Sequence, residues 1–144
     1  MIATVAVGTD GSGTAEKAVL SALELAERYG ARIVFISAYA PVDESRLRHE
    51  KREAPDEVQW MINPEEDVDA TLRECEQLAE ERGLRWASEA AQGEAAEILI
   101  QLADRHEADV LVIGNRGMNR RVLGSVPNSV THNANCTVFL VKTT

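Results

Sequence analysis

Hydrophobic and polar positions follow two different periods along the chain. Five short runs are largely apolar and rich in β-branched residues: residues 3–8, 32–39, 84–91, 109–113 and Thr137–Lys142. The third run is the weakest of the five. Apolar runs of this length are typical of strands that are buried on both faces of a sheet.

Between these runs, apolar residues recur at the 3.6-residue spacing of an amphipathic helix. Helices are therefore predicted over residues 14–29, 65–82, 94–105 and Ser125–Asn133. Strands that alternate with amphipathic helices indicate parallel pairing, with helices on both faces. We predict a Rossmann-like α/β fold with a doubly wound, five-stranded parallel sheet of order 3-2-1-4-5. The charged, proline-containing segment 41–64 is predicted to be a connection inside this fold.

Composition and charge narrow the classes of function. The 144 residues carry a formal net charge of −9, and this length predicts one domain over residues 1–144. The negative charge argues against a protein that coats nucleic acid and against a basic membrane-surface helix. No apolar run is long enough to cross a membrane, and the N-terminal residues lack the pattern of a signal peptide. We expect a cytoplasmic protein.

Cysteine and histidine spacing gives no metal motif. Cys75 and Cys136 belong to no C-x-x-C pair, and the three histidines lack the H-x-H and H-x-x-x-H spacings. We expect no metal site and two free, small apolar cysteines.

The C-terminal segment differs in charge from the rest of the chain. Residues 114–144 contain Arg116, Arg120, Arg121 and Lys142 but no acidic residue. Two interpretations of this absence of acidic residues stand. The segment binds a small anion, or it is simply a loop and strand that carry few charges.

Glycine-rich segments follow the first and fourth predicted strands, at the sheet edge where ligands bind in this fold class. The first, Gly8 to Gly13, has the wrong glycine order for a dinucleotide fingerprint, and the chain has no P-loop. Within it, Asp10 is either a turn residue or a ligand contact. In the second, Gly114 and Gly117 allow close backbone approach, and Gly124 precedes a helix N-terminus that favours an anion. The alternative is a tight turn followed by an ordinary serine cap.

These segments resemble the universal stress protein family. The resemblance is carried by VAVGTDGSGTAEKAV, VFISAY, ADVLVIGNRG, LGSVPNSV and CTVFLVK, and it extends over essentially the whole chain. ATP-binding members of that family carry G-x2-G-x9-G-[ST]. Here six residues separate Gly117 from Gly124, so the nucleotide loop is three residues short.

The resemblance implies nine positions that contact an adenine nucleotide: Thr9, Asp10, Ala38, Ile113, Gly114, Gly117, Gly124, Ser125 and Val126. The first two should border the adenosine, the third the adenine edge, and the next two the ribose. The last four should donate hydrogen bonds to phosphates. The arginines at 116, 120 and 121 are not motif positions; either they compensate by charge for the short loop or they are solvated surface residues.

The resemblance implies binding of ATP or another adenine nucleotide, with Mg²⁺ as a companion, and a regulatory role in stress response. We find no nucleophile–base pair and no carboxylate dyad, so no catalytic residue is assigned and at most slow ATP hydrolysis is expected. Two alternatives stay open. One is a cyclic AMP-binding member, and the other is a nucleotide-independent regulatory homodimer. In either case the edge strand Thr137–Lys142 is expected to pair with its copy in a homodimer.

Overall fold

Five parallel strands form the centre of the molecule. In the computed structural model, which describes residues 1–10, 13–39, 65–115 and 124–142, they are β1 (Thr4–Gly8), β2 (Arg32–Tyr39), β3 (Trp86–Gln92), β4 (Val110–Asn115) and β5 (Thr137–Lys142). Their order in the sheet is β3-β2-β1-β4-β5, and every neighbouring pair is parallel. The predicted fold class and strand order are confirmed.

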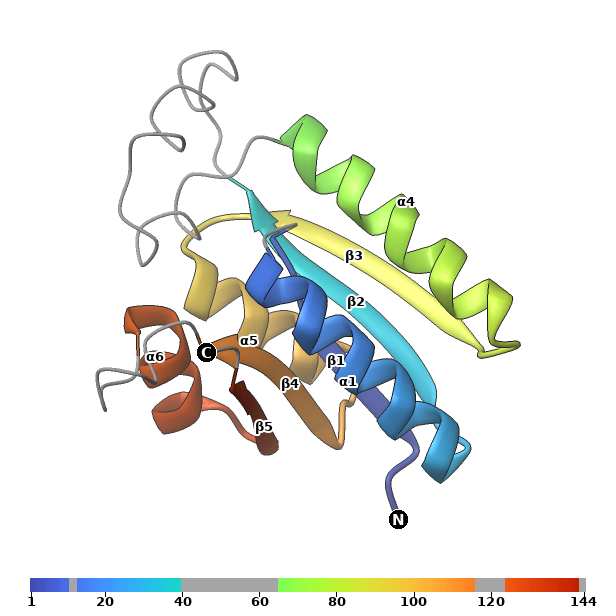
Figure 1. Cartoon of the computed structure of the whole chain (residues 1–144). Helices are drawn as coiled ribbons and strands as arrows, with labels where there is room; N and C mark the ends of the chain where they lie inside the picture. The colour runs from blue at the N-terminus through green and yellow to red at the C-terminus, as the bar shows by residue number, and fades with distance from the viewer. Residues whose placement is uncertain (11–12, 40–64, 116–123, 143–144) are drawn as a thin grey trace.

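The four helices of the described residues cover the two faces of this sheet (Figure 1). They are α1 (Gly13–Tyr29), α4 (Glu65–Glu81), α5 (Ala95–Arg105) and α6 (Ser125–Asn133). Helices α1 and α4 share one hydrophobic cluster with the sheet, and α5 and α6 share the other. The predicted connection 41–64 lies outside the described residues.

Alternation along each strand explains the two clusters. In β1, Val5 and Val7 belong to the cluster under α1 and α4, whereas Ala6 between them belongs to the cluster under α5 and α6. All three side chains are fully buried. Because successive side chains of a strand point to opposite faces, a strand covered on both sides must be apolar at every position. Because of this requirement, the strands of the sheet could be predicted from their apolar runs in the sequence.

Several element boundaries differ from the sequence-based prediction by one or two residues, and two of these differences are informative. Helix α5 starts at Ala95, because Glu94 is its N-cap and accepts hydrogen bonds from the N–H groups of Ala96 and Glu97 at 3.1 and 3.0 Å. Strand β4 continues two residues past Ile113, and its last residue, Asn115, is in register with β5. The second difference matters for function, since it brings Asn115 into the sheet.

A carboxylate joins the first residues of β1 to β4 at the amino edge of the sheet. Oδ2 of Asp109 accepts hydrogen bonds from the backbone N–H groups of Ala3 and Thr4 at 2.8 and 2.9 Å. These two bonds, that of Ala3 first, hold the pKa of Asp109 below its usual value.

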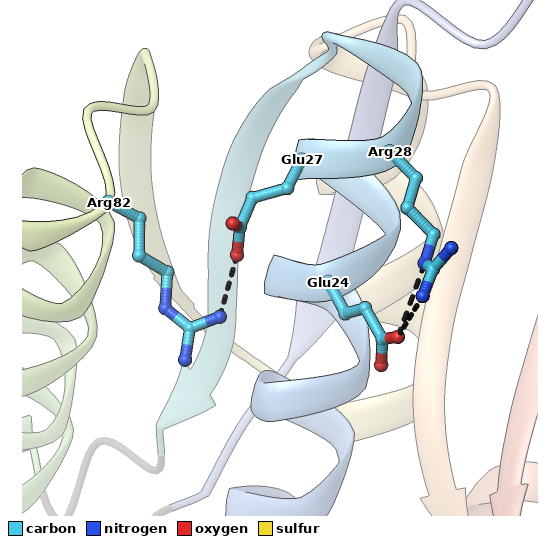
Figure 2. Close-up of polar contacts among 4 residues, drawn as sticks. All are labelled: Glu24, Glu27, Arg28 and Arg82. Carbon is cyan, nitrogen blue, oxygen red and sulfur yellow. Dashed lines mark hydrogen bonds and ion pairs between the residues drawn. The ribbon is translucent and has the colours of Figure 1, made fainter.

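One surface ion pair connects α1 to the residue that follows α4, and a second lies within α1. Figure 2 shows Arg82 directed at Glu27 of α1, with a nitrogen–oxygen distance of 2.7 Å, and Arg28 paired with Glu24 one turn earlier at 3.0 Å. All four side chains are at least about one-third exposed, and such pairs each contribute roughly 0.2–1 kcal/mol. The packing of the two helices therefore rests mainly on their buried faces.

Candidate functional site

The turn after β1 is held in place by β2. The N–H of Thr9 donates to the carbonyl oxygen of Ile36 at 3.1 Å, and the hydroxyl of the buried Ser37 donates to the carbonyl oxygen of Thr9. Asp10 follows directly and is only 7% exposed. A carboxylate this close to full burial, at the carboxyl end of a central strand, belongs to a constrained site rather than to a solvated turn.

The carboxyl ends of β1, β2 and β4 bring most of the described candidate residues to one edge of the sheet. Ala38 lies near the end of β2, and Ile113 and Gly114 lie near the end of β4; all three are buried. The chain runs from β1 toward β3 on one side and from β4 to β5 on the other. The strand order thus reverses between β1 and β4, where ligands bind in open α/β sheets.

The N-cap of α6 is tied to this edge by a side chain. Gly124 is the N-cap of α6, and its N–H donates to Oδ1 of Asn115 at 3.0 Å. The resemblance to the family had implied that this N–H donates to a phosphate group of the ligand. Sequence reasoning did not single out Asn115, although a lone polar residue directly after a buried apolar strand was a usable signal.

The same helix terminus has two backbone donors available to a ligand. The N–H of Asn128 donates to the carbonyl oxygen of Gly124 at 2.9 Å, and Pro127 has no N–H. Within the described residues, no hydrogen bond takes up the N–H of Ser125 or Val126. The Ser125 side chain is exposed, whereas the Val126 side chain is buried among α5 and α6, so Val126 can serve a ligand only through its backbone.

Gly124 has no conformational need to be glycine. Its φ of −61° and ψ of 166° suit any residue. A Cβ built on it would meet Oδ1 of Asn115 and Cδ of Pro127 at 3.5 Å, which is ordinary contact. Among the described residues, nothing prevents a side chain here, and this favours a glycine kept for close approach by a ligand.

Four further candidates, Arg116, Gly117, Arg120 and Arg121, lie outside the described residues. Of the basic residues in the acid-free segment, Lys142 is described. It ends β5 in register with Asn115, so it stands at the same edge of the sheet as the candidate site.

A small cavity between α1 and α4 touches the candidate site only at Thr9. Its volume is about 130 Å³, and Val19, Cys75 and Leu78 are among its lining residues. Pockets that take drug-sized ligands are about 300–1,000 Å³, so this cavity is too small for a nucleotide.

Across the described ranges there is also no cluster of three side chains suited to a metal ion, and no helix there is both long and apolar enough to cross a membrane.

Comparison with known protein families shows the family to which this chain belongs. A sequence model of the universal stress protein family matches residues 1–142. This chain belongs to the universal stress protein family. It is 33% identical over 148 aligned positions to a universal stress protein of Mycobacterium tuberculosis, covering 98% of this chain and 97% of that protein. It is 30% identical over 144 positions to one of Methanocaldococcus jannaschii, covering 96% of this chain and 81% of that protein.

Solved universal stress protein structures have the same fold. One crystal structure, a universal stress protein in complex with cyclic AMP, is 30% identical, covers 99% of both chains and superposes with a TM-score of 0.73. A second, from Archaeoglobus fulgidus in complex with dAMP, covers 99% of this chain and 98% of its own, with a TM-score of 0.68. At 20% identity, the second likeness shows the fold alone.

Proposed function

We propose that this universal stress protein binds an adenine nucleotide of the ATP type at the carboxyl edge of its sheet and acts as a regulator in stress response. The start of α6 carries the proposal: two N–H groups that no described residue engages, and an exposed serine hydroxyl, directly follow Gly124, which is bonded to Asn115 at the end of β4. A helix N-terminus favours an anionic group through its N–H donors and its dipole. Residues 1–144 would act as one such domain.

In the proposed complex, Asp10 and Thr9 border the adenosine, Ala38 meets the adenine edge through its backbone, and Ile113 and Gly114 lie near the ribose. Ser125 and Val126 donate to phosphate, joined by Gly117 and, for a triphosphate, by Mg²⁺ and the arginines 116, 120 and 121. Because these donors are mostly backbone groups, the arrangement favours binding, with at most slow hydrolysis of ATP.

Cyclic AMP is the second candidate ligand. The observation that favours it is the 30% identical universal stress protein whose crystal structure contains cyclic AMP. The described start of α6 has two N–H groups and one hydroxyl to offer, which suits a single phosphoryl group.

A titration with ATP, ADP, AMP, cyclic AMP and adenosine, with and without Mg²⁺, tests these proposals. Calorimetry gives the Kd values, and a ligand at 100 times its Kd should raise the free energy of unfolding by about 2.7 kcal/mol. Tighter binding of ATP than of cyclic AMP supports the first proposal, and the reverse order supports the second. No stabilisation by any of the five at millimolar concentration would refute nucleotide binding.

Gly124→Ala locates the site. Since position 124 tolerates a Cβ within the described structure, the variant should fold with wild-type stability yet bind nucleotide at least about tenfold more weakly, because the methyl group blocks close approach. Asn133→Ala, at the exposed far end of α6, is the matched control and should bind normally. Equal affinity of Gly124→Ala and wild type would remove α6 from the site.

A nucleotide-independent homodimer through Thr137–Lys142 is the remaining candidate. Strand β5 is an edge of the sheet, and its Phe139 side chain is 45% exposed. An open apolar edge can pair with a second copy across a two-fold axis. Light scattering should give the mass of a dimer for the wild type and of a monomer for Phe139→Asp; a monomeric wild type would contradict the pairing.

A further inference from the structure

One buried side chain sets where α6 begins. Asn115 is 1% exposed, and its Oδ1 reaches the N–H of Gly124, nine residues further along the chain. Strand β4 is fixed on both sides, by β1 and β5. The hydrogen bond therefore transfers the position of a central strand to the first turn of a helix.

This bond also decides which donors face a ligand. Position 124 is engaged with the protein, position 127 is proline, and position 128 closes the first helical bond. Among the described residues, the two N–H groups left without a partner are those of Ser125 and Val126, the residues that directly follow the tethered one. Their distance from the end of β4 depends on the bond that Asn115 makes.

We propose that Asn115 is a positioning residue of the nucleotide site: acting through Gly124, it holds the N–H groups of Ser125 and Val126 where a phosphoryl group of the ligand accepts them. This role rests on the proposed function. It requires an acceptor at position 115, and it also requires that the acceptor be neutral, because a carboxylate there would stand beside the ligand's negative charge.

Two substitutions separate these requirements. Asn115→Ala removes the acceptor and frees the start of α6. Asn115→Asp keeps an oxygen that can accept the Gly124 N–H but adds a negative charge. Calorimetric titration at pH 8 with adenosine, cyclic AMP and AMP compares ligands whose phosphoryl groups are absent, singly charged and doubly charged.

For Asn115→Ala, we expect the Kd of cyclic AMP to rise about tenfold, as for loss of one positioned hydrogen bond, while that of adenosine changes less than about twofold. For Asn115→Asp, adenosine should again bind normally, cyclic AMP about tenfold more weakly, and AMP more weakly still. Asn133→Asp adds the same charge at the other end of α6 and should leave all three Kd values unchanged.

Hydrogen exchange of the Gly124 amide, measured by NMR without ligand, tests the tether separately. It should be protected in the wild type and in Asn115→Asp and lose protection in Asn115→Ala. Circular dichroism checks that each variant folds; if the alanine variant does not, the aspartate variant supplies the test through its dependence on ligand charge.

Three outcomes would overturn the proposal. Equal weakening of adenosine and cyclic AMP would show a merely structural role, and unchanged affinity for all ligands would show none. A wild type that binds no adenine nucleotide would overturn the proposed function, and this role with it, even where Gly124 is protected.

Discussion

The last residue of β1, Gly8, packs against α5 at a distance that leaves no room for a side chain. A Cβ at position 8 would lie 3.1 and 3.2 Å from the two methyl carbons of Leu99. Carbon atoms in favourable contact are about 3.5–4.0 Å apart, so the methyl group of Gly8→Ala would be a few tenths of an ångström too close. Leu99 is fully buried and surrounded by the cluster under α5 and α6, and it cannot easily yield.

We expect Gly8→Ala to lower the free energy of unfolding. Overpacking a core typically costs about 1–3 kcal/mol, and the lower entropy of the unfolded alanine chain offsets about 0.5–1 kcal/mol of this. The net loss should be about 1 kcal/mol. Urea unfolding followed by circular dichroism measures it, with an unchanged m value as the check that the compactness of the unfolded state is the same.

A double-mutant cycle with Leu99→Ala tests the cause. Leu99→Ala alone should cost about 2–5 kcal/mol because it leaves a cavity. In the double variant the methyl group at position 8 enters that cavity, so the combined loss should fall short of the sum by more than about 0.5 kcal/mol. Gly30→Ala is the control: it is strained by a φ of +63° but has open space around its Cβ, and it should combine additively with Leu99→Ala. Additivity at Gly8 as well, or a stabilising Gly8→Ala, would refute the reasoning.

Three further predictions concern single side chains. Glu94→Ala should cost about 1 kcal/mol, since the cap of α5 loses both backbone partners, and a thermal melt that matches the wild type would contradict the capping role. The pKa of Asp109 is depressed, so the stability that this carboxylate contributes is present above its usual pKa of 3.8 and is lost as pH falls through the lower pKa of the folded state. The difference in free energy of unfolding between wild type and Asp109→Asn, measured by urea unfolding, should therefore narrow toward pH 2–3. A difference that stays constant with pH would disprove the linkage. Burial, followed by the charges of its glutamate neighbours, raises the pKa of Cys75 to about 12. At pH 8 an aromatic disulfide reagent should therefore label the half-buried Cys136 first and Cys75 only on unfolding. Equal labelling rates for the two thiols would argue against this protection of Cys75.

The regular elements were predictable where local pattern and tertiary packing agree. The bounds of β2, α6 and β5 coincide with those read from the sequence. Strand β4 was read as ending at Ile113, since glycine and asparagine disfavour strands. The ladder to β5 extends it, pairing Gly114 with Val141 and Asn115 with Lys142, and no local signal carries that pairing.

The candidate site was predictable only in outline. Residues at strand ends, such as Asp10 and Gly114, follow from the fold class, because parallel strands bring their carboxyl ends to one edge. The role of Asn115 does not follow from the fold class, since it depends on where α6 docks relative to β4. For the same reason, sequence reasoning gave the Gly124 N–H to phosphate when Asn115 accepts it.

The bond between Asn115 and Gly124 has a consequence for how the family's loop can vary in length. It pins both ends of the connection 116–123, so the ends keep their places whatever number of residues joins them. The entropy of closing a flexible loop depends only on the logarithm of its length, and shortening a connection from eleven residues to eight changes that free energy by only about 0.3 kcal/mol. A tethered connection is thus a segment where insertions and deletions accumulate at little cost in stability. Under the proposed function, a loop three residues shorter would alter the contacts with the ligand while leaving the first turn of α6 where it was.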